Sequence, residues 1–191
     1  MRQAISDMNL WKSFIEGDDK AFETLFELYS DIMFRYGTKF IRNEDAVKDC
    51  IQSVFIKVFD NRKKLPLTDS PKLYLLRALK NKIIDEIRNN SKTEQTTPEK
   101  IIFYADMHYV GDDTGDDNIK ERVEKILSSL TERQKEAIYL KYQMGLEYED
   151  ISKIMNINYQ STRNLVHRAI EKVRAEMKIS IFLLIFLQYF Y

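Results

Sequence analysis

The chain has 191 residues, and its 30 Lys and Arg balance its 30 Asp and Glu, so it carries no net charge at neutral pH. Five glycines and three prolines are few, which favours helices over turn-rich β structure. The single cysteine, Cys50, excludes an internal disulfide framework and fits a reducing cytosol; because it lies in a helical pattern, we expect a small buried hydrophobe rather than a reactive thiol.

The N-terminal half shows helical periodicity and no strand pattern. Its first 19 residues lack a continuous apolar run, so we expect no secretory signal. Asp18 or Asp19 can cap a helix that begins near Lys20. Further helices are expected over residues 32–41, 44–59 and 72–90.

Charge divides the chain into three parts. Residues 60–90 hold eight Lys or Arg against four Asp or Glu, and residues 159–178 hold five against two. Residues 91–119 hold two against seven and show no sustained apolar period. We therefore expect an extended acidic linker over residues 91–119, with a short apolar anchor at residues 101–104. The two basic segments can contact phosphates even though the whole chain is neutral.

The C-terminal half is also expected to be helical. An amphipathic helix covers residues 119–127, and Thr131 caps the helix that follows. Residues 145–169 then show the pattern of two short helices around a tight turn. In that turn Asn156 can take the left-handed conformation, and Asn158 can cap the second helix.

The second helix of this hairpin has an apolar face and a polar face. A helix divided in this way can lie in the major groove of DNA, where Arg163 can contact guanine, and Gln160 or Asn164 can contact adenine. A solvated hairpin in an ordinary helical bundle has the same periodicity, so the pattern alone leaves both interpretations open. The inward face comprises Thr162, Leu165, Val166, Ala169 and Val173, and the outward face comprises Gln160, Arg163, Asn164, His167, Arg168 and Glu171.

Five stretches resemble, in this order, the conserved segments of RNA polymerase sigma factors of the extracytoplasmic-function (ECF) type. GDDKAFETLFELY is similar to the start of the family's N-terminal domain, DAVKDCIQSVFIKVF to its polymerase-binding helix and KLYLLRALKNKIIDEIR to its promoter-melting helix. LSSLTERQKEAIYLKY and GLEYEDISKIMNINYQSTRNLVHRAIEKVR resemble the helix-turn-helix domain that reads the promoter. The resemblance implies an all-α fold with two small helical domains, residues 1–90 and 120–178, joined by a flexible linker.

The resemblance implies a bacterial transcription initiation factor. It would bind core RNA polymerase, recognise the minus-35 promoter element through its C-terminal domain, and recognise and melt the minus-10 element through its N-terminal domain. The implied partners are core polymerase, promoter DNA and an anti-sigma factor, in the cytoplasm or held at the membrane through that anti-sigma factor. No catalytic residue, metal, cofactor or small-molecule substrate is expected, because the polymerase performs the chemistry.

The resemblance also indicates which residues bind DNA and polymerase. The loop before residue 72 is the family's candidate for holding an unstacked base. Leu165 stands where the family usually has a basic residue, so we expect it to pack rather than to contact DNA. The resemblance assigns Asp49, Gln52 and Phe55 to polymerase binding; Lys72, Tyr74, Arg77, Lys80, Asn81 and Lys82 to the minus-10 element; and Gln160, Ser161, Arg163, Asn164, His167, Arg168 and Lys172 to the minus-35 element.

The conserved pattern leaves the hydrophobic tail, residues 179–191, unexplained. It is too short to span a bilayer as a helix, and we expect it to dock on the chain's own domains, on a partner protein or, least of all, on a membrane surface.

The main functional alternative is a stand-alone helix-turn-helix regulator that binds DNA without polymerase. An enzyme is disfavoured, because the sequence shows neither metal-ligand spacing nor a glycine-rich phosphate loop.

Overall fold

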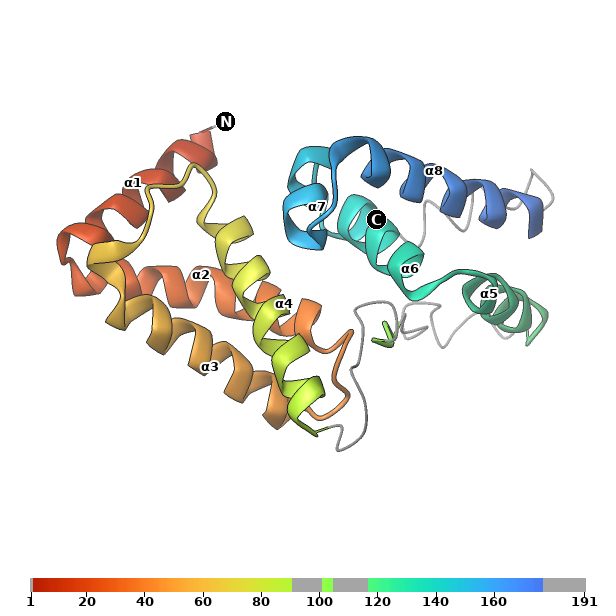
Figure 1. Cartoon of the computed structure of the whole chain (residues 1–191), viewed down its shortest axis with the longest axis horizontal. Helices are drawn as coiled ribbons and strands as arrows, with labels where there is room; N and C mark the ends of the chain where they lie inside the picture. Colours follow the sequence, from red (N-terminus) through yellow and green to blue (C-terminus); the bar gives the residue numbers. More distant parts are fainter. Residues whose placement is uncertain (1, 91–100, 105–116, 177–191) are drawn as a thin grey trace. The chain divides into compact units, whose positions relative to one another are not determined.

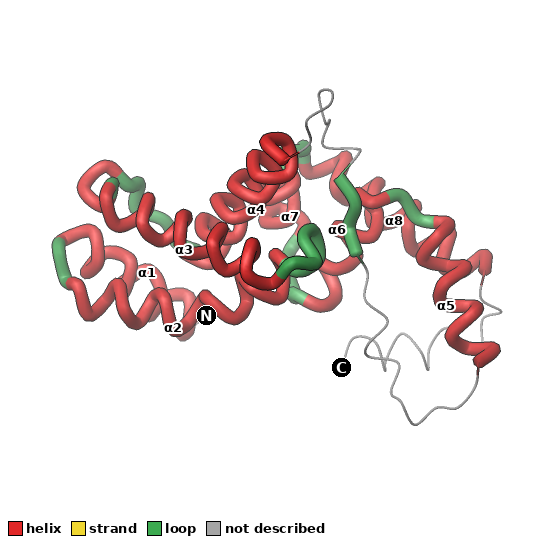
Figure 2. Tube along the Cα trace, turned by 90° about the horizontal axis from the view of Figure 1, so that it is seen from below, coloured by secondary structure: helices red, strands yellow, loops and turns green. Residues whose placement is uncertain are grey.

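The computed structural model describes residues 2–90, 101–104 and 117–176, and among these residues the only regular secondary structure is helical (Figures 1 and 2). The helices form two units, Met1–Pro98 and Glu99–Tyr191. This confirms the all-α prediction. Most of the acidic linker and the tail at 179–191 lie outside the described residues, so the interpretations placed on them stay predictions. None of the described helices is long and apolar enough to cross a membrane.

Four helices and one short 3-10 turn build the first unit. In this unit α2 packs against α1, α3 and α4, so the four helices share one core (Figure 1). Trp11 and Phe14 on α1, Leu25 on α2 and Leu79 on α4 are among its fully buried side chains. The elements are α1 (Arg2–Glu16), α2 (Asp19–Gly37), α3 (Glu44–Asp60), η1 (Arg62–Lys64) and α4 (Pro71–Asn90).

The separate helix expected over residues 32–41 is wrong, because the chain up to Gly37 belongs to α2, which is one continuous helix. Its buried positions Leu25, Tyr29 and Met33 keep a four-residue spacing through Ser30 and Asp31, and neither glycine nor proline interrupts them. The cap is Asp18, whose carboxylate accepts hydrogen bonds from the backbone N–H groups of residues 20 and 21 at 2.9 and 3.3 Å.

The end of α2 lies very close to α3. A Cβ on Gly37 would stand 2.6 Å from Cγ1 of Val47, closer than real side-chain contacts. Glycine is therefore required here for close packing of two helices, and not for an unusual backbone conformation.

The second unit consists of α5 (Asp117–Ser129), α6 (Glu132–Ile138), the π-helical turn η3 (Tyr139–Gln143), α7 (Tyr148–Met155) and α8 (Tyr159–Glu176). The expected helix after Thr131 is thus interrupted at residue 139, where the chain widens into the π turn that brings it to α7. Thr131 and Gln134 form a reciprocal capping box: Gln134 N–H donates to Thr131 Oγ1 at 3.3 Å, and Thr131 N–H donates to Gln134 Oε1 at 3.0 Å.

The turn between α7 and α8 has the conformation that the sequence predicts. Asn156 ends α7 with φ 52° and ψ 50°, in the left-handed region. Asn158 Oδ1 accepts a hydrogen bond from Ser161 N–H at 2.7 Å, so it caps α8.

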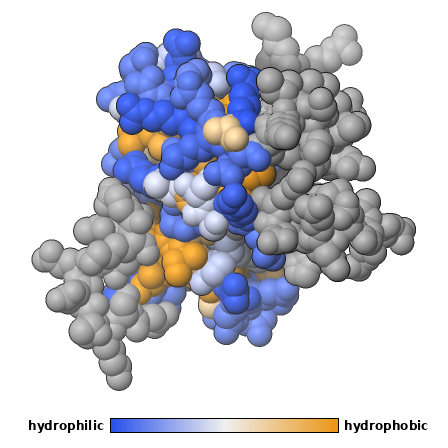
Figure 3. Space-filling view, turned by 90° about the vertical axis from the view of Figure 1, so that its right-hand side faces the viewer, coloured by the Kyte–Doolittle hydropathy of each residue, from blue (hydrophilic) through white to orange (hydrophobic). Residues whose placement is uncertain are grey.

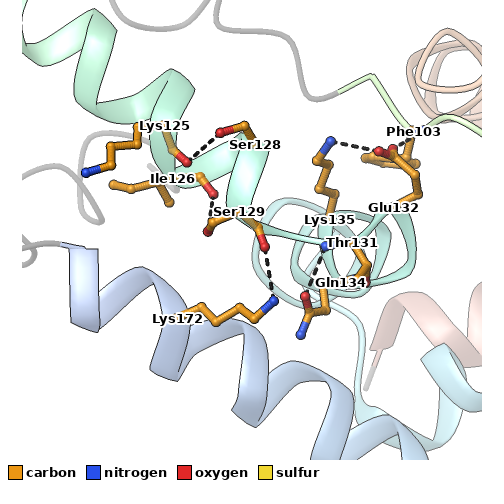
Figure 4. A network of polar contacts seen from close by, with 10 residues as sticks. All are labelled: Phe103, Lys125, Ile126, Ser128, Ser129, Thr131, Glu132, Gln134, Lys135 and Lys172. Carbon is orange, nitrogen blue, oxygen red and sulfur yellow. Dashed lines mark hydrogen bonds and ion pairs between the residues drawn. The ribbon is translucent and has the colours of Figure 1, made fainter.

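The apolar anchor of the linker packs against this second unit. Ile101 and Phe103 are buried, and the Phe103 ring lies 5.6 Å from the ring of Tyr139. Phe103 N–H donates to Glu132 Oε2 at 2.6 Å, and Glu132 also pairs with Lys135 at 2.9 Å (Figure 4). Residues 101–104 are therefore fixed to α6.

Candidate functional sites

The α7–α8 hairpin presents a polar helix face. Thr162, Val166 and Ala169 are buried and dock α8 on the rest of the unit, whereas Leu165 is half-buried, as expected for a packing residue. The side chains that the family resemblance assigns to the minus-35 element are all exposed on α8: Gln160, Ser161, Arg163, Asn164, His167, Arg168 and Lys172.

Aromatic and cationic side chains alternate around the start of α8. The Lys141 ammonium lies 4.8 Å from the Tyr148 ring, the rings of Tyr148 and Tyr159 are 6.2 Å apart, and the Arg163 guanidinium lies 5.9 Å from the Tyr159 ring. The Arg163 guanidinium thus lies against an aromatic ring in the first turn of the helix, whereas the Lys141 ammonium is also paired with Glu147 Oε2 at 2.9 Å. Sequence reasoning missed Tyr148 and Tyr159 in this role; two tyrosines flanking the turn were the available signal.

Two pairs of polar side chains on α8 make contacts on the helix itself. Gln160 Nε2 donates to Asn164 Oδ1 at 3.2 Å, so these amides present their remaining donor and acceptor groups together. His167 Nδ1 lies 3.3 Å from Glu171 Oε2, an ion pair when the imidazole is protonated.

Lys172 differs from the rest of this face. Its Nζ donates to the backbone carbonyl of Ser129, the last residue of α5, at 3.0 Å (Figure 4). A second link joins the same two helices, because Lys125 pairs with Glu176 at 3.4 Å. The structure therefore places Lys172 in the α5–α8 contact.

A groove of about 560 Å³ opens between α3, the following loop and α4 in the first unit. Four basic side chains and one carboxylate border it, so its charge suits phosphates. We call it the α3–α4 groove; among its lining residues are Lys57, Lys64, Leu65, Tyr74, Arg77, Asn81, Lys82 and Asp85.

The α3–α4 groove collects four of the six residues assigned to the minus-10 element: Tyr74, Arg77, Asn81 and Lys82. They lie together because three- and four-residue steps place side chains on one face of a helix. Lys72 and Lys80 are not in its lining. Lys57 and Lys64 line it and were missed; the basic run at residues 62–64 was the available signal.

The exposed face of α3 joins polar and apolar groups. Of the three residues assigned to polymerase binding, Asp49 and Gln52 are exposed, but Phe55 is buried, with 3% of its surface accessible. Ile56 and Phe59, 61% and 37% exposed, continue the face of Asp49 and Gln52. Phe26 from α2 is also partly exposed, and its ring lies 4.9 Å from that of Phe55. We call Phe26, Ile56 and Phe59 the apolar patch.

On the face shown in Figure 3, hydrophilic residues cover most of the described surface, and hydrophobic residues appear in smaller areas between them. An exposed apolar group beside charged residues is therefore informative, because such patches commonly mark contacts with other proteins.

Comparison with known proteins gives the family. The sigma-70 region 2 family model matches residues 25–93, and the sigma-70 region 4 family model matches residues 120–173. The chain is 23% identical over 159 residues to the ECF RNA polymerase sigma factor SigM of Bacillus subtilis, covering 80% of this chain and 93% of SigM. It is 24% identical over 187 residues to the ECF RNA polymerase sigma-E factor of Haemophilus influenzae, covering 93% of this chain and 98% of that protein.

Solved structures agree in fold. CnrH, in a complex with the cytosolic domain of CnrY, superimposes with a TM-score of 0.61 at 18% identity, covering 88% of this chain and 95% of CnrH. The sigma factor RpoE of Bartonella quintana, in a complex with the anti-sigma factor NepR, gives 0.60 at 21% identity, covering 84% and 98%. The two domains in this order and their relatives show that the chain belongs to the ECF family of RNA polymerase sigma factors.

Proposed function

We propose that this chain binds bacterial core RNA polymerase and directs promoter recognition, DNA melting and transcription initiation. The proposal rests on two features of one chain. The region 4 unit exposes polar and basic side chains along α8, and the region 2 unit has the basic α3–α4 groove. Sigma factors are not enzymes, and we assign no reaction to this chain.

We assign the minus-35 element to α8. Arg163, close to the helix start and supported by Tyr159, contacts guanine, while the Gln160–Asn164 pair contacts adenine. Ser161, His167 and Arg168 contact the flanking bases and phosphates. Lys172 is the weakest member of this set, since its ammonium already binds the carbonyl of Ser129.

We assign the minus-10 element to the α3–α4 groove. Separated strands need cations for their phosphates and an apolar or aromatic surface for an unstacked base. Arg77 and Lys82 supply charge here, Lys57 and Lys64 add to it, and Tyr74 supplies the aromatic surface.

We assign polymerase binding to the exposed face of α3. Asp49 and Gln52 provide polar contacts, and the apolar patch beside them provides the buried area that a stable protein interface needs. Phe55 supports this surface from below. Because the sigma factor RpoE, which has the same fold, was co-crystallised with the anti-sigma factor NepR, we also propose an anti-sigma partner for this chain, which would act in the cytoplasm or hold it at the membrane.

Assembly with core polymerase distinguishes this function from a stand-alone regulator. The purified chain is mixed with core polymerase, and the complex is isolated by size-exclusion chromatography and tested for binding to genomic DNA fragments. We expect a complex that retains fragments that neither component retains alone. Selective retention by the free chain, without complex formation, would instead support the regulator.

A further inference from the structure

The loop between α3 and α4 is hydrogen-bonded to α1, a helix that contributes no residue to the lining of the α3–α4 groove. Trp11 of α1 is fully buried, and its indole N–H donates to the backbone carbonyl of Pro66 at 3.0 Å. A buried indole N–H normally requires an acceptor, so this bond fixes the loop at the level of Pro66.

Trp11 also contacts the groove itself. Its ring lies 5.3 Å from the ring of Tyr74, at an interplanar angle of 54°. Tyr74 and Leu65, the residue before Pro66, both line the α3–α4 groove. Trp11 therefore contacts two sides of the groove: it binds the loop through a hydrogen bond and packs against Tyr74 of α4 through an aromatic contact.

The loop is tied down at its start as well. Arg62 pairs with Asp19, at the beginning of α2, at 2.8 Å. The segment between the two ties ends at Pro66, and Leu67 follows with 68% of its surface exposed. The ties leave an apolar side chain pointing to solvent from a loop whose backbone is fixed.

We infer that Trp11 is a positioning residue for single-stranded DNA in the α3–α4 groove: it holds the loop and Tyr74 in the arrangement that receives an unstacked base. This inference rests on the proposed function of the groove. A loop that is already ordered binds its ligand more tightly, because it loses less conformational entropy on binding. The consequence is that α1, far from the groove lining in sequence, controls the strength of strand capture.

Trp11 is the only tryptophan of the chain, so its fluorescence reports on this contact without a label. The full-length protein is titrated with short single-stranded DNA of degenerate sequence and with the same DNA as duplex. We expect a saturable change in tryptophan emission with the single strand and a much smaller change with the duplex. Emission that stays constant while the strand binds would contradict the inference.

Two variants separate positioning from general stability. Trp11→Phe keeps an aromatic ring but removes the N–H donor, and we expect about fivefold weaker single-strand binding, the equivalent of one hydrogen bond. Because this variant has no tryptophan, strand affinity is measured for all variants by the fluorescence anisotropy of an end-labelled single strand. Phe14→Leu alters the neighbouring buried aromatic of α1, whose ring contacts include Phe22 and Phe59 in addition to Trp11. It should lower the melting temperature and leave strand affinity within about twofold.

Hydrogen exchange of residues 65–70 gives an independent readout. It should become faster in Trp11→Phe and stay unchanged in Phe14→Leu. The inference is overturned if Trp11→Phe binds the strand like the wild type, or if Phe14→Leu loses as much affinity. Promoter-dependent initiation by the wild type is measured separately. If the wild type initiates normally and Trp11→Phe binds the single strand normally, only the inference is contradicted. If the wild type does not initiate, the proposed function is contradicted.

Discussion

The ammonium of Lys172 on α8 donates a hydrogen bond to the backbone carbonyl of Ser129, the last residue of α5. A cation at this position satisfies a terminal carbonyl and interacts favourably with the helix dipole. The helix that we propose for the minus-35 element is thereby attached to α5 by one of the residues that the family pattern assigns to that element.

Lys172→Met should therefore act mainly on stability. We expect a loss of up to about 1 kcal/mol in the free energy of unfolding, measured by urea denaturation, with little change in promoter affinity. Arg168→Met is the matched control, an exposed cation on the same helix, and should lower promoter affinity and its salt dependence without changing stability. Equal loss of DNA binding in Lys172→Met and Arg168→Met would show that Lys172 contacts DNA rather than acting mainly on stability.

Gly37→Ala should destabilise the first unit. The added methyl would stand 2.6 Å from Val47 Cγ1, and overpacking of this kind costs about 1–3 kcal/mol. The double variant Gly37→Ala/Val47→Ala removes the clashing methyl groups of Val47, so its loss should be smaller than the sum of the two single losses. Simple additivity in thermal or urea unfolding would show that the clash is not the cause.

Asn156 should tolerate glycine but not alanine. Its φ of 52° costs an ordinary L-residue about 1 kcal/mol, so Asn156→Ala should lower stability by roughly that amount. Asn156→Gly should match the wild type within a few tenths of a kcal/mol. Equal melting temperatures for the alanine and glycine variants would contradict this explanation of the turn.

Ile56→Ser should weaken polymerase binding. The side chain is exposed in the free protein, and if its burial against polymerase is worth about 1.5 kcal/mol, affinity should fall about tenfold. Leu28→Ser is the control, an exposed leucine on α2 outside the apolar patch, and should bind polymerase normally. Unchanged affinity of Ile56→Ser, measured by fluorescence anisotropy with labelled protein, would remove the apolar patch from the interface.

The thiol of Cys50 should be unreactive in the folded protein. It is buried, and burial, the largest cause, raises the pKa of the thiol, opposed by the charge of Lys82 and reinforced by Glu86 and Asp49. A raised pKa means less thiolate, the reactive form, at every pH below it. Reaction with Ellman's reagent at pH 8 should be slow in buffer and fast in denaturant; equal rates would contradict the burial.

Local signals made much of the fold predictable. Thr131, Asn156 and Asn158 act at the positions that the sequence indicates, because capping and left-handed turns depend on a few neighbouring residues. The break expected within α2 was wrong, since the polar pair at residues 30–31 can lie on the solvent side of a continuous helix. The whole of α1 was missed, although Leu10, Trp11 and Phe14 recur at helical spacing; it packs mainly on the next helix, α2, and also on η1 and α4.

The candidate sites were predictable in outline only. Residues on one helix, such as Tyr74, Arg77 and Asn81, are brought together as their spacing predicts. Phe55 and Ile56 show the limit: they are adjacent and both apolar, and only packing against Phe22 and Phe26 determines that Phe55 is buried and Ile56 exposed. The link from Trp11 to Pro66 spans 55 residues and leaves no local signal.

Transcription initiation tests the central proposal most directly. Core RNA polymerase from the organism that encodes this chain is incubated with its genomic DNA fragments, with and without the protein, and the 5′ ends of the transcripts are mapped. The proposal predicts new start sites that depend on the protein, share two upstream sequence elements and are lost with Arg163→Ala. Polymerase binding or DNA binding without any protein-dependent start site would contradict it.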